Sequence, residues 1–480
     1  MLPKLTLLPF AAVLLTAVSA EAQQSPIERV GPLAINLDEF EFYSPYWPFT
    51  DAFKSARSWI SQAIDNEQPF DTFETIPVTE MGWPLPPADL AAVNVLFREL
   101  EFLYPEGVYD VFWEGSGTVE FILDATLIQT VAPGHAQIDV EPTYEGIGIK
   151  VYGVDPADPV RNIRVIMPGF AQTWQTETFH PDFLSEVEPF GALRFMQWQE
   201  TNFAPTVDWS ERSTPETYSQ AAEHGVAVEF LVELCNTADK GGWFTMPYLA
   251  NDNYVREFAR YVAQNMEPEL PVFIEYSNEV WNQSFLAYSH AQEQGALAGL
   301  PGTPFEQALR WYSERSVQVA EIWRQEFEAV SGPAWSDRRV RVMGAQHANP
   351  FTSEVVLDHN GAAASMDVLA TAPYFGFAYG DPANTVSTVN TPIPQIIQDL
   401  LLEVQGPVAA RVAEHVAVAT ARNVELIAYE GGQHMNARGS GFFNPVLVDK
   451  LADINRDPGM FDVYVAYPVS YTHLTLPTKA

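Results

Sequence analysis

From Gly169 onward the sequence alternates between short apolar segments and longer segments with helical periodicity. The clearest helical patterns cover residues 254–265, 305–331 and 393–421. Alternation of this kind predicts parallel strands joined by crossover helices. With one strand near the N-terminus, the predicted strands are 33–37, 192–198, 226–234, 272–276, 340–345, 368–372 and 424–429.

Seven parallel strands are one fewer than a closed (β/α)8 TIM barrel contains. Residues 457–467 have the pattern of a last helix before an eighth strand. Residues 468–480 look like one reading frame of a sequencing-library adapter, so we expect the natural chain to continue after Tyr467. The predicted fold class is therefore α/β: a C-terminally truncated TIM barrel in which strand eight is missing. Because open strand edges are a liability, we expect this chain to be poorly stable or inactive.

A segment with a different sequence pattern interrupts the predicted barrel at residues 103–168. Short strands at 108–113, 118–122, 136–140 and 148–152 are separated by Gly and Pro turns, which predicts a small antiparallel module of sandwich type. Residues 23–102 would supply the first barrel strand, a helix at 52–65 and a Pro-rich loop, and residues 169–467 the remainder of the barrel. The module is either a structural insertion or an accessory glycan-binding sheet, and the lack of an aromatic platform pattern favours the first.

Composition limits where the protein works and what it binds. Residues 1–22 combine a basic start, an apolar run and an A-x-A site, which predicts a signal peptide and an exported protein that leaves the membrane after cleavage. The net charge of −37 disfavours nucleic acid and anionic polymers and favours a neutral partner. The single cysteine, Cys235, cannot form an intramolecular disulfide, and we expect it to be buried. We also expect a monomer.

Two of the predicted strands deliver an acidic residue at their C-terminal ends. Strand 272–276 runs into Asn278 and Glu279, and strand 424–429 runs into Glu430 and two glycines. Active sites of such barrels gather at this end of the strands. A pair of carboxylic acids is what retaining glycoside hydrolysis needs, since one protonates the leaving oxygen and the other attacks the sugar. The alternative for each is a solvated loop glutamate or a partner for a helix start.

This arrangement resembles the large clan of retaining glycoside hydrolases with TIM barrels, whose catalytic glutamates end strands four and seven. The resemblance implies that Glu279, preceded by Asn278, is the acid/base and that Glu430 is the nucleophile. Through Trp47-Pro48-Phe49, Arg194-Phe195-Met196 and residues 275–282, the chain is also similar to secreted bacterial proteins called cellulase-like or cellulose-binding. A retaining mechanism predicts carboxyl groups about 5–5.5 Å apart.

Other residues at the predicted strand ends could support this chemistry. Arg194 could hold Glu430 ionised, and Tyr374 could donate a hydrogen bond to it; the alternatives are a salt bridge under a loop and ordinary packing. Asn278 would bind the sugar 2-hydroxyl. His347 and His434 could line the cleft, although each could equally be a satisfied loop histidine.

Aromatic side chains would complete the cleft, because sugars present apolar C–H faces. Trp243 and Trp281 are the main candidates, and Trp198 is weaker because it closes an apolar run. Glu275 lies inside its strand and is not expected to be catalytic. No spacing suggests metal ligands, so we expect neither metal nor cofactor. The sequence thus favours a retaining hydrolase of a neutral β-linked polysaccharide, with a non-catalytic carbohydrate-binding protein as the alternative.

Overall fold

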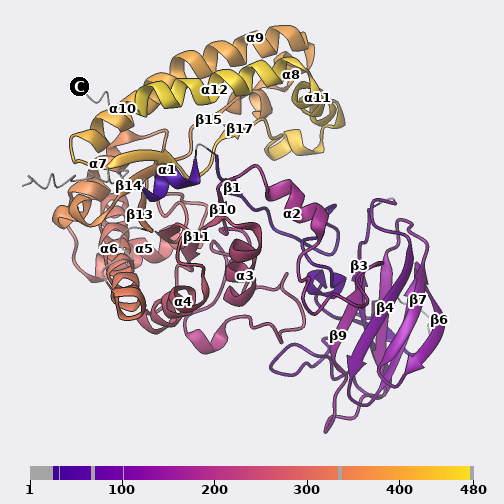
Figure 1. The fold of residues 1–480 in the computed structure, drawn as a ribbon. Helices are drawn as coiled ribbons and strands as arrows, with labels where there is room; N and C mark the ends of the chain where they lie inside the picture. The colour runs from indigo at the N-terminus through magenta and orange to yellow at the C-terminus, as the bar shows by residue number, and fades with distance from the viewer. Residues whose placement is uncertain (1–24, 32, 66–70, 101, 333–337, 476–480) are drawn as a thin grey trace, which may run out of the picture.

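The computed structural model describes residues 25–31, 33–65, 71–100, 102–332 and 338–475. The predicted signal segment 1–22 and the last five residues of the presumed adapter segment lie outside this range. The described chain forms a parallel sheet surrounded by helices, and a separate antiparallel part beside it (Figure 1).

Seven parallel strands form one curled sheet, compatible with part of a barrel. Neighbours in the sheet follow the order of the chain, as the alternation of strands and helices predicted. The strands, in sheet order, are β1 (Ile35–Asn36), β10 (Ala192–Arg194), β11 (Gly241–Met246), β12 (Val272–Tyr276), β13 (Arg339–Gly344), β14 (Val368–Thr371) and β16 (Glu425–Ala428).

Helices cover the outer face of this sheet (Figure 1). The longest, α6, starts with a capping box in which Thr303 and Glu306 satisfy each other's backbone N–H groups. The three main helical patterns are confirmed, the last as two helices joined by a π-turn at Val404–Val408. The helices are α1 (Pro26–Val30), α2 (Pro181–Val187), α3 (Val228–Ala238), α4 (Asp252–Asn265), α5 (Leu286–Leu297), α6 (Pro304–Ser331), α7 (Pro350–Asp358), α8 (Thr385–Asn390), α9 (Ile393–Glu403), α10 (Ala409–Thr420), α11 (Pro445–Arg456) and α12 (Gly459–Thr475).

The prediction of a third strand at 226–234 is wrong. This run forms most of helix α3, and the third strand is β11, which begins with Gly241 and Gly242. A Cβ on Gly242 would lie 2.7 Å from the ring of Phe244, so a larger residue there would force that ring to move. Cys235 is fully buried, as expected, but in helix α3.

The antiparallel part consists of two four-stranded sheets, and it starts earlier in the chain than residue 103. The helix predicted at 52–65 is wrong: a 3₁₀ turn at Ala52–Ser55 is followed by a strand that pairs with β3. One sheet has the order β2 (Ile60–Ala63), β3 (Leu90–Leu96), β8 (Ile147–Tyr152) and β5 (Thr118–Leu123). The other has the order β6 (Ala125–Ala132), β7 (His135–Val140), β4 (Gly107–Glu114) and β9 (Arg161–Ile166).

The C-terminal helices α8, α9, α11 and α12 form a layer at the side of the sheet near β15 (Tyr374–Phe375) and β17 (Gly432–Gln433) (Figure 1). These two short strands pair in parallel just beyond the ends of β14 and β16. Tyr467 of α12 donates to the carbonyl of Pro373 at 2.9 Å and accepts from the N–H of Gly432 at 3.2 Å. The helix predicted at 457–467 is present as the first part of α12, which therefore supports the loops after two sheet strands.

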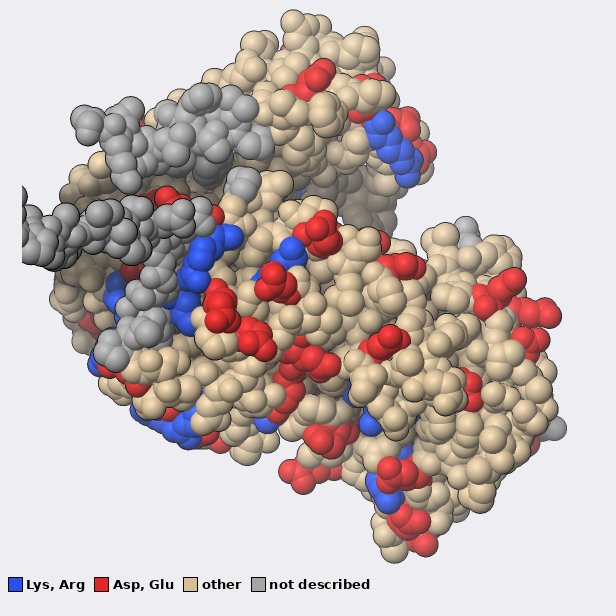
Figure 2. Space-filling model, in the orientation of Figure 1, with Lys and Arg blue, Asp and Glu red and all other residues tan. Residues whose placement is uncertain are grey.

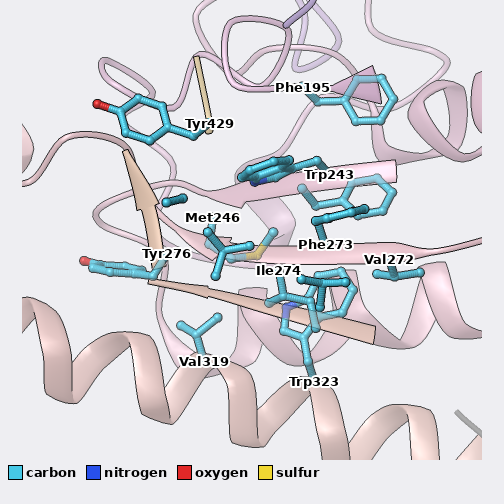
Figure 3. Close-up of a cluster of buried hydrophobic side chains, with 14 of the residues drawn as sticks. Phe195, Trp243, Met246, Val272, Phe273, Ile274, Tyr276, Val319, Trp323 and Tyr429 are labelled. Atoms are coloured by element: carbon cyan, nitrogen blue, oxygen red, sulfur yellow. The ribbon is translucent and has the colours of Figure 1, made fainter. Parts of the chain in front are cut away.

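The core of the parallel part lies between the strands and helices α3 to α6. Figure 3 shows Trp243 and Phe273, whose rings stack 5.0 Å apart, above Ile274 and Trp323. Acidic side chains are spread over the visible face of both parts, with fewer basic ones, in keeping with the net charge of −37 (Figure 2). Within the described residues, no helix is both long and apolar enough to cross a bilayer.

Candidate active site

A pocket of about 780 Å³ opens at the C-terminal ends of the parallel strands. Glu279, which follows β12, and Glu430, which follows β16, both line it. Strands β12 and β16 are three places apart in the sheet, so only its curl brings their ends to one pocket. Asn278, Tyr374, His347, His434 and Trp281 also line this pocket.

Glu430 is held by a cation and a hydroxyl. Arg194 Nη1 lies 2.8 Å from Glu430 Oε1, and the Tyr374 hydroxyl donates to Oε2. The Glu430 side chain is 16% exposed, so it is mostly desolvated but remains open to the pocket. Both predicted partners of this carboxylate are therefore in place.

Arg194 is in turn held in place by Glu275 and Asn36. Its Nε and Nη2 atoms donate to Glu275 Oε2 at 3.1 and 3.0 Å, and Nη1 also donates to Asn36 Oδ1 at 3.1 Å. Trp243 Nε1 donates to the same Glu275 oxygen at 2.8 Å. Burial alone would lower the pKa of Arg194, but the charges of Glu275 and Glu430 outweigh it and the pKa is raised. The guanidinium is thus a permanently charged, rigidly oriented support for Glu430.

The burial of Glu275 has the opposite effect on its own titration. Desolvation raises the pKa of this carboxyl, while the charge and hydrogen bonds of Arg194 act against it. With a side chain only 2% exposed, Glu275 has no access to a substrate. It positions Arg194, which agrees with the prediction that it is not catalytic.

Glu279 has a different set of partners. Its Oε1 accepts from the Tyr429 hydroxyl at 2.6 Å and its Oε2 accepts from Asn282 Nδ2 at 2.8 Å. The backbone is strained here, because Ser277 and Glu279 have φ values of 57° and 43°. Such conformations cost on the order of 1–3 kcal/mol each and are concentrated at ligand and active sites.

Asn278 lies between these two strained residues and is clamped from both sides. Its Oδ1 accepts from Arg194 Nη2 at 3.0 Å, and its Nδ2 donates to Asn202 Oδ1 at 3.2 Å. The residue is 3% exposed but lies on the pocket wall. An amide held in this way presents a fixed edge to whatever enters the pocket.

Two tyrosines bind the carboxyl groups and stay neutral. Burial, followed by the charge of Glu430, raises the pKa of Tyr374, and burial followed by the charge of Glu279 raises that of Tyr429. Both hydroxyls therefore keep their protons over the whole working range of pH. Tyr374 donates to Glu430 and Tyr429 to Glu279, so each carboxyl has its own phenol.

The two predicted histidines lie on the pocket wall. His434 packs edge-on against Tyr374, with ring centroids 4.9 Å apart. His347 stacks on His415, and burial, together with His415 and Arg411, lowers the pKa of His347 to about 3. His347 is thus neutral at ordinary pH.

The predicted tryptophans divide into two groups. Trp281 lines the pocket, although it is only 4% exposed. Trp243 does not reach the pocket wall: it is 3% exposed and lies beneath the site, so its expected contact with a sugar is not supported. Trp198 is a core residue, as its apolar surroundings suggested.

The open aromatic faces of the pocket belong to phenylalanines that sequence reasoning did not single out. Phe203 is 60% exposed and Phe377 is 53% exposed, and Phe285 packs edge-on against Phe203. Phe203 lies in a turn and Phe377 starts a short 3₁₀ helix, so no periodic pattern marks either of them. Tyr429 and Asn282 were also missed, although their positions next to Glu430 and near Glu279 were the available signal.

Among the described residues, no group of three or more His, Cys, Asp or Glu side chains is arranged to hold a metal ion. Comparison with known proteins gives no family for this chain: no family model matches it, and neither does any curated protein.

Proposed function

We propose that the protein is an exported retaining glycoside hydrolase that acts on a neutral β-linked polysaccharide. The observation that supports this most strongly is the different environment of the two glutamates in one pocket. Glu430 is bound by a guanidinium and a phenol, whereas Glu279 is bound by a phenol and an amide. Acid and base roles for two carboxyl groups require environments that differ in this way.

In the proposed reaction, Glu430 attacks the anomeric carbon and the bond to the leaving oxygen breaks. Glu279 gives its proton to that oxygen. Glu279 then removes a proton from water, which displaces Glu430 and regenerates both groups. When Glu279 carries the acidic proton, the Tyr429 hydroxyl can turn to accept it, because a hydroxyl both donates and accepts.

Arg194 and Tyr374 would hold the carboxylate of Glu430 in position before attack. Asn278, fixed by Arg194 and Asn202, would bind the sugar 2-hydroxyl as the transition state forms. Among the described residues, the charged side chains on the pocket wall are glutamates, with no lysine or arginine. A glycan with carboxylate or sulfate groups would be repelled, which supports a neutral substrate.

We further propose that the parallel sheet belongs to a (β/α)8 barrel. A barrel of this type would need one more strand between β16 and β1, the two edges of the sheet. Its catalytic groups would occupy the C-terminal ends of strands four and seven, which is where Glu279 and Glu430 stand in the strand order.

The test is reducing-sugar release from neutral β-glucans, xylans and mannans by the protein and its variants. We expect Glu430→Gln to lower the rate on the order of 10⁴-fold or more, and Glu279→Gln to lower it by about 10²–10⁴-fold. Glu354→Gln, an exposed glutamate on α7, is the matched control and should behave as the parent.

The anomeric form of the first product, followed by NMR, should be that of the substrate. An inverted product would contradict the retaining mechanism. A folded protein that binds a glycan without releasing sugar would favour the carbohydrate-binding alternative.

A further inference from the structure

Part of the pocket wall is built by a single turn of chain that follows β10. Gln197, Glu200, Asn202 and Phe203 all line the pocket from this turn. The turn is firmly held: the N–H of Glu200 donates to the carbonyl of Gln197 at 2.9 Å, and the carbonyl of Glu200 accepts from the N–H groups of Phe203 and Ala204 at 2.9 and 2.7 Å.

Glu200 is the acidic residue of this turn. It is half-buried on the pocket wall, and its carboxyl makes no hydrogen bond or ion pair with any residue that the structure describes. Its backbone has a φ of 49°, a conformation rare for residues other than glycine. A desolvated polar group that is left open to a cavity is suited to a polar ligand.

Phe203 supplies the apolar face of the same region. Its ring is 60% exposed and is supported edge-on by Phe285, with centroids 6.3 Å apart. An exposed ring beside an unpartnered carboxyl offers both contacts that a pyranose ring uses, its apolar C–H face and its hydroxyl groups.

We propose that Glu200 and Phe203 form a sugar subsite next to the catalytic pair, in which the carboxyl of Glu200 binds the hydroxyl groups of a second, neutral sugar unit. This inference rests on the proposed function, since it extends the same pocket along the glycan. It assigns the protein a substrate of at least two sugar units and makes Glu200 a residue that determines chain-length specificity.

The proton on Glu200 makes this subsite sensitive to pH. Burial, and then the charges of Glu39 and Glu41, raise the pKa of Glu200 to about 7. A sugar that covers the carboxyl removes more water from it, which disfavours the charged form further. Glu200 should therefore bind the sugar better below pH 7, where it is protonated, than above it. The other titratable groups on the pocket wall are Glu39, Glu279, Glu430, His347, His434, Tyr374 and Tyr429.

The experiment measures oligosaccharide binding by calorimetry in the Glu430→Gln protein, so that hydrolysis does not interfere. The probes are cello-, xylo- and manno-oligosaccharides of one to five units, at pH 6 and pH 8. We expect the affinity for oligosaccharides of two or more units to exceed that for the single sugar, and we call this ratio of affinities the chain-length gain. It should be about three- to tenfold smaller at pH 8 than at pH 6.

Three added substitutions separate the possible roles of the side chain. Glu200→Gln, which mimics the neutral carboxyl, should keep the chain-length gain at both pH values, and Glu200→Ala should lose it at both. Glu186→Gln, an exposed glutamate on α2, should behave as its parent. A purely structural role for Glu200 would not produce a chain-length gain that depends on pH in the parent and not in the Gln variant.

Two results would overturn the subsite. One is an equal chain-length gain in Glu200→Ala and the parent, and the other is a pH effect that persists in Glu200→Gln. Either could occur while the Glu430-dependent hydrolysis described above is intact, so failure of the subsite and failure of the proposed function are distinguishable.

Discussion

Two regions of this molecule bury charged side chains, and they use them differently. In the parallel sheet, Arg194 and Glu275 are 1% and 2% exposed and lie 3.0 Å apart, and their network reaches Glu430 on the pocket wall. In the antiparallel part, Lys150 is fully buried as well, but its ammonium donates to the backbone carbonyl of Ile64 at 2.8 Å. The first network ends at a cavity, whereas this contact of Lys150 joins two segments of its own region.

The difference shows that a buried charge does not by itself mark a site. Any buried ion must have partners, because its desolvation is costly. Lys150 ties β8 to the residues that follow β2, so it stabilises a connection. Arg194 meets that need with Glu275 and Asn36 and still directs one N–H toward Glu430. A functional role is indicated where such a network opens to a pocket.

The substitution with the largest expected effect on stability is Glu275→Gln. It would leave the charge of Arg194 buried with one carboxylate fewer, which we expect to lower the free energy of unfolding by about 3–5 kcal/mol. Because the guanidinium would lose its anchor, kcat/KM should also fall, by at least about tenfold per folded molecule. Urea unfolding and initial rates measure the two effects.

Glu326→Gln is the matched control for that substitution. Glu326 lies on α6 and pairs with Arg256 and Arg260 of α4, and its side chain is 11% exposed. These three residues are not part of the pocket wall. It should lower stability without changing kcat/KM per folded molecule. Equal effects of both substitutions on kcat/KM would remove the distinction between the two kinds of buried charge.

The corresponding substitution in the antiparallel part is Lys150→Met. It keeps the length of the side chain but leaves the carbonyl of Ile64 without this donor, so we expect a loss of about 1–3 kcal/mol in the free energy of unfolding. Activity per folded molecule should be unchanged. Lys450→Met on α11 controls for the loss of one positive charge. A fall in kcat/KM with Lys150→Met alone would show that the two regions are coupled.

The sequence predicted the fold best where periodicity was unambiguous. Strand β12 and helices α4 and α6 were predicted nearly to the residue, because their apolar positions fit only one period. The apolar residues of the run 226–234 fit both the two-residue period of a strand and the 3.6-residue period of a helix. Whether the run forms a strand or a helix therefore depended on packing that the sequence does not reveal. Strand β2 is stabilised by pairing with β3 some thirty residues later, which no local pattern reports.

The candidate site was predictable as far as strand ends could be identified. Glu279, Glu430 and Tyr374 each follow a predicted strand, and the parallel sheet gathers such positions at one edge. Arg194 ends β10, although that strand was predicted to continue to Trp198. The direction of a side chain within its strand was harder to infer, which is why Trp243 was expected in the cleft and lies beneath it. Loop residues such as Phe203 had no periodic signal at all.

The smallest expected effect concerns the acid sensitivity of the parallel part. The pKa of His347 is lowered to about 3 by burial, and then by His415 and Arg411, against about 6.5 in an unfolded chain. Between these values the unfolded chain binds a proton that the folded protein does not, so stability falls as pH decreases from 6.5 toward 3. From pH 7 to 5.5, His347 should account for about 1 kcal/mol of the lost free energy of unfolding.

His347→Phe tests this, since phenylalanine keeps a ring against His415 but cannot take up a proton. Urea unfolding at pH 7 and 5.5 should give a smaller decrease for the variant than for the parent, by that same amount. The pKa of His415 is also lowered by burial, and it acts in both proteins, so the difference isolates His347. If the two decreases were equal, His347 would not contribute to the acid sensitivity, which would have to arise from other groups.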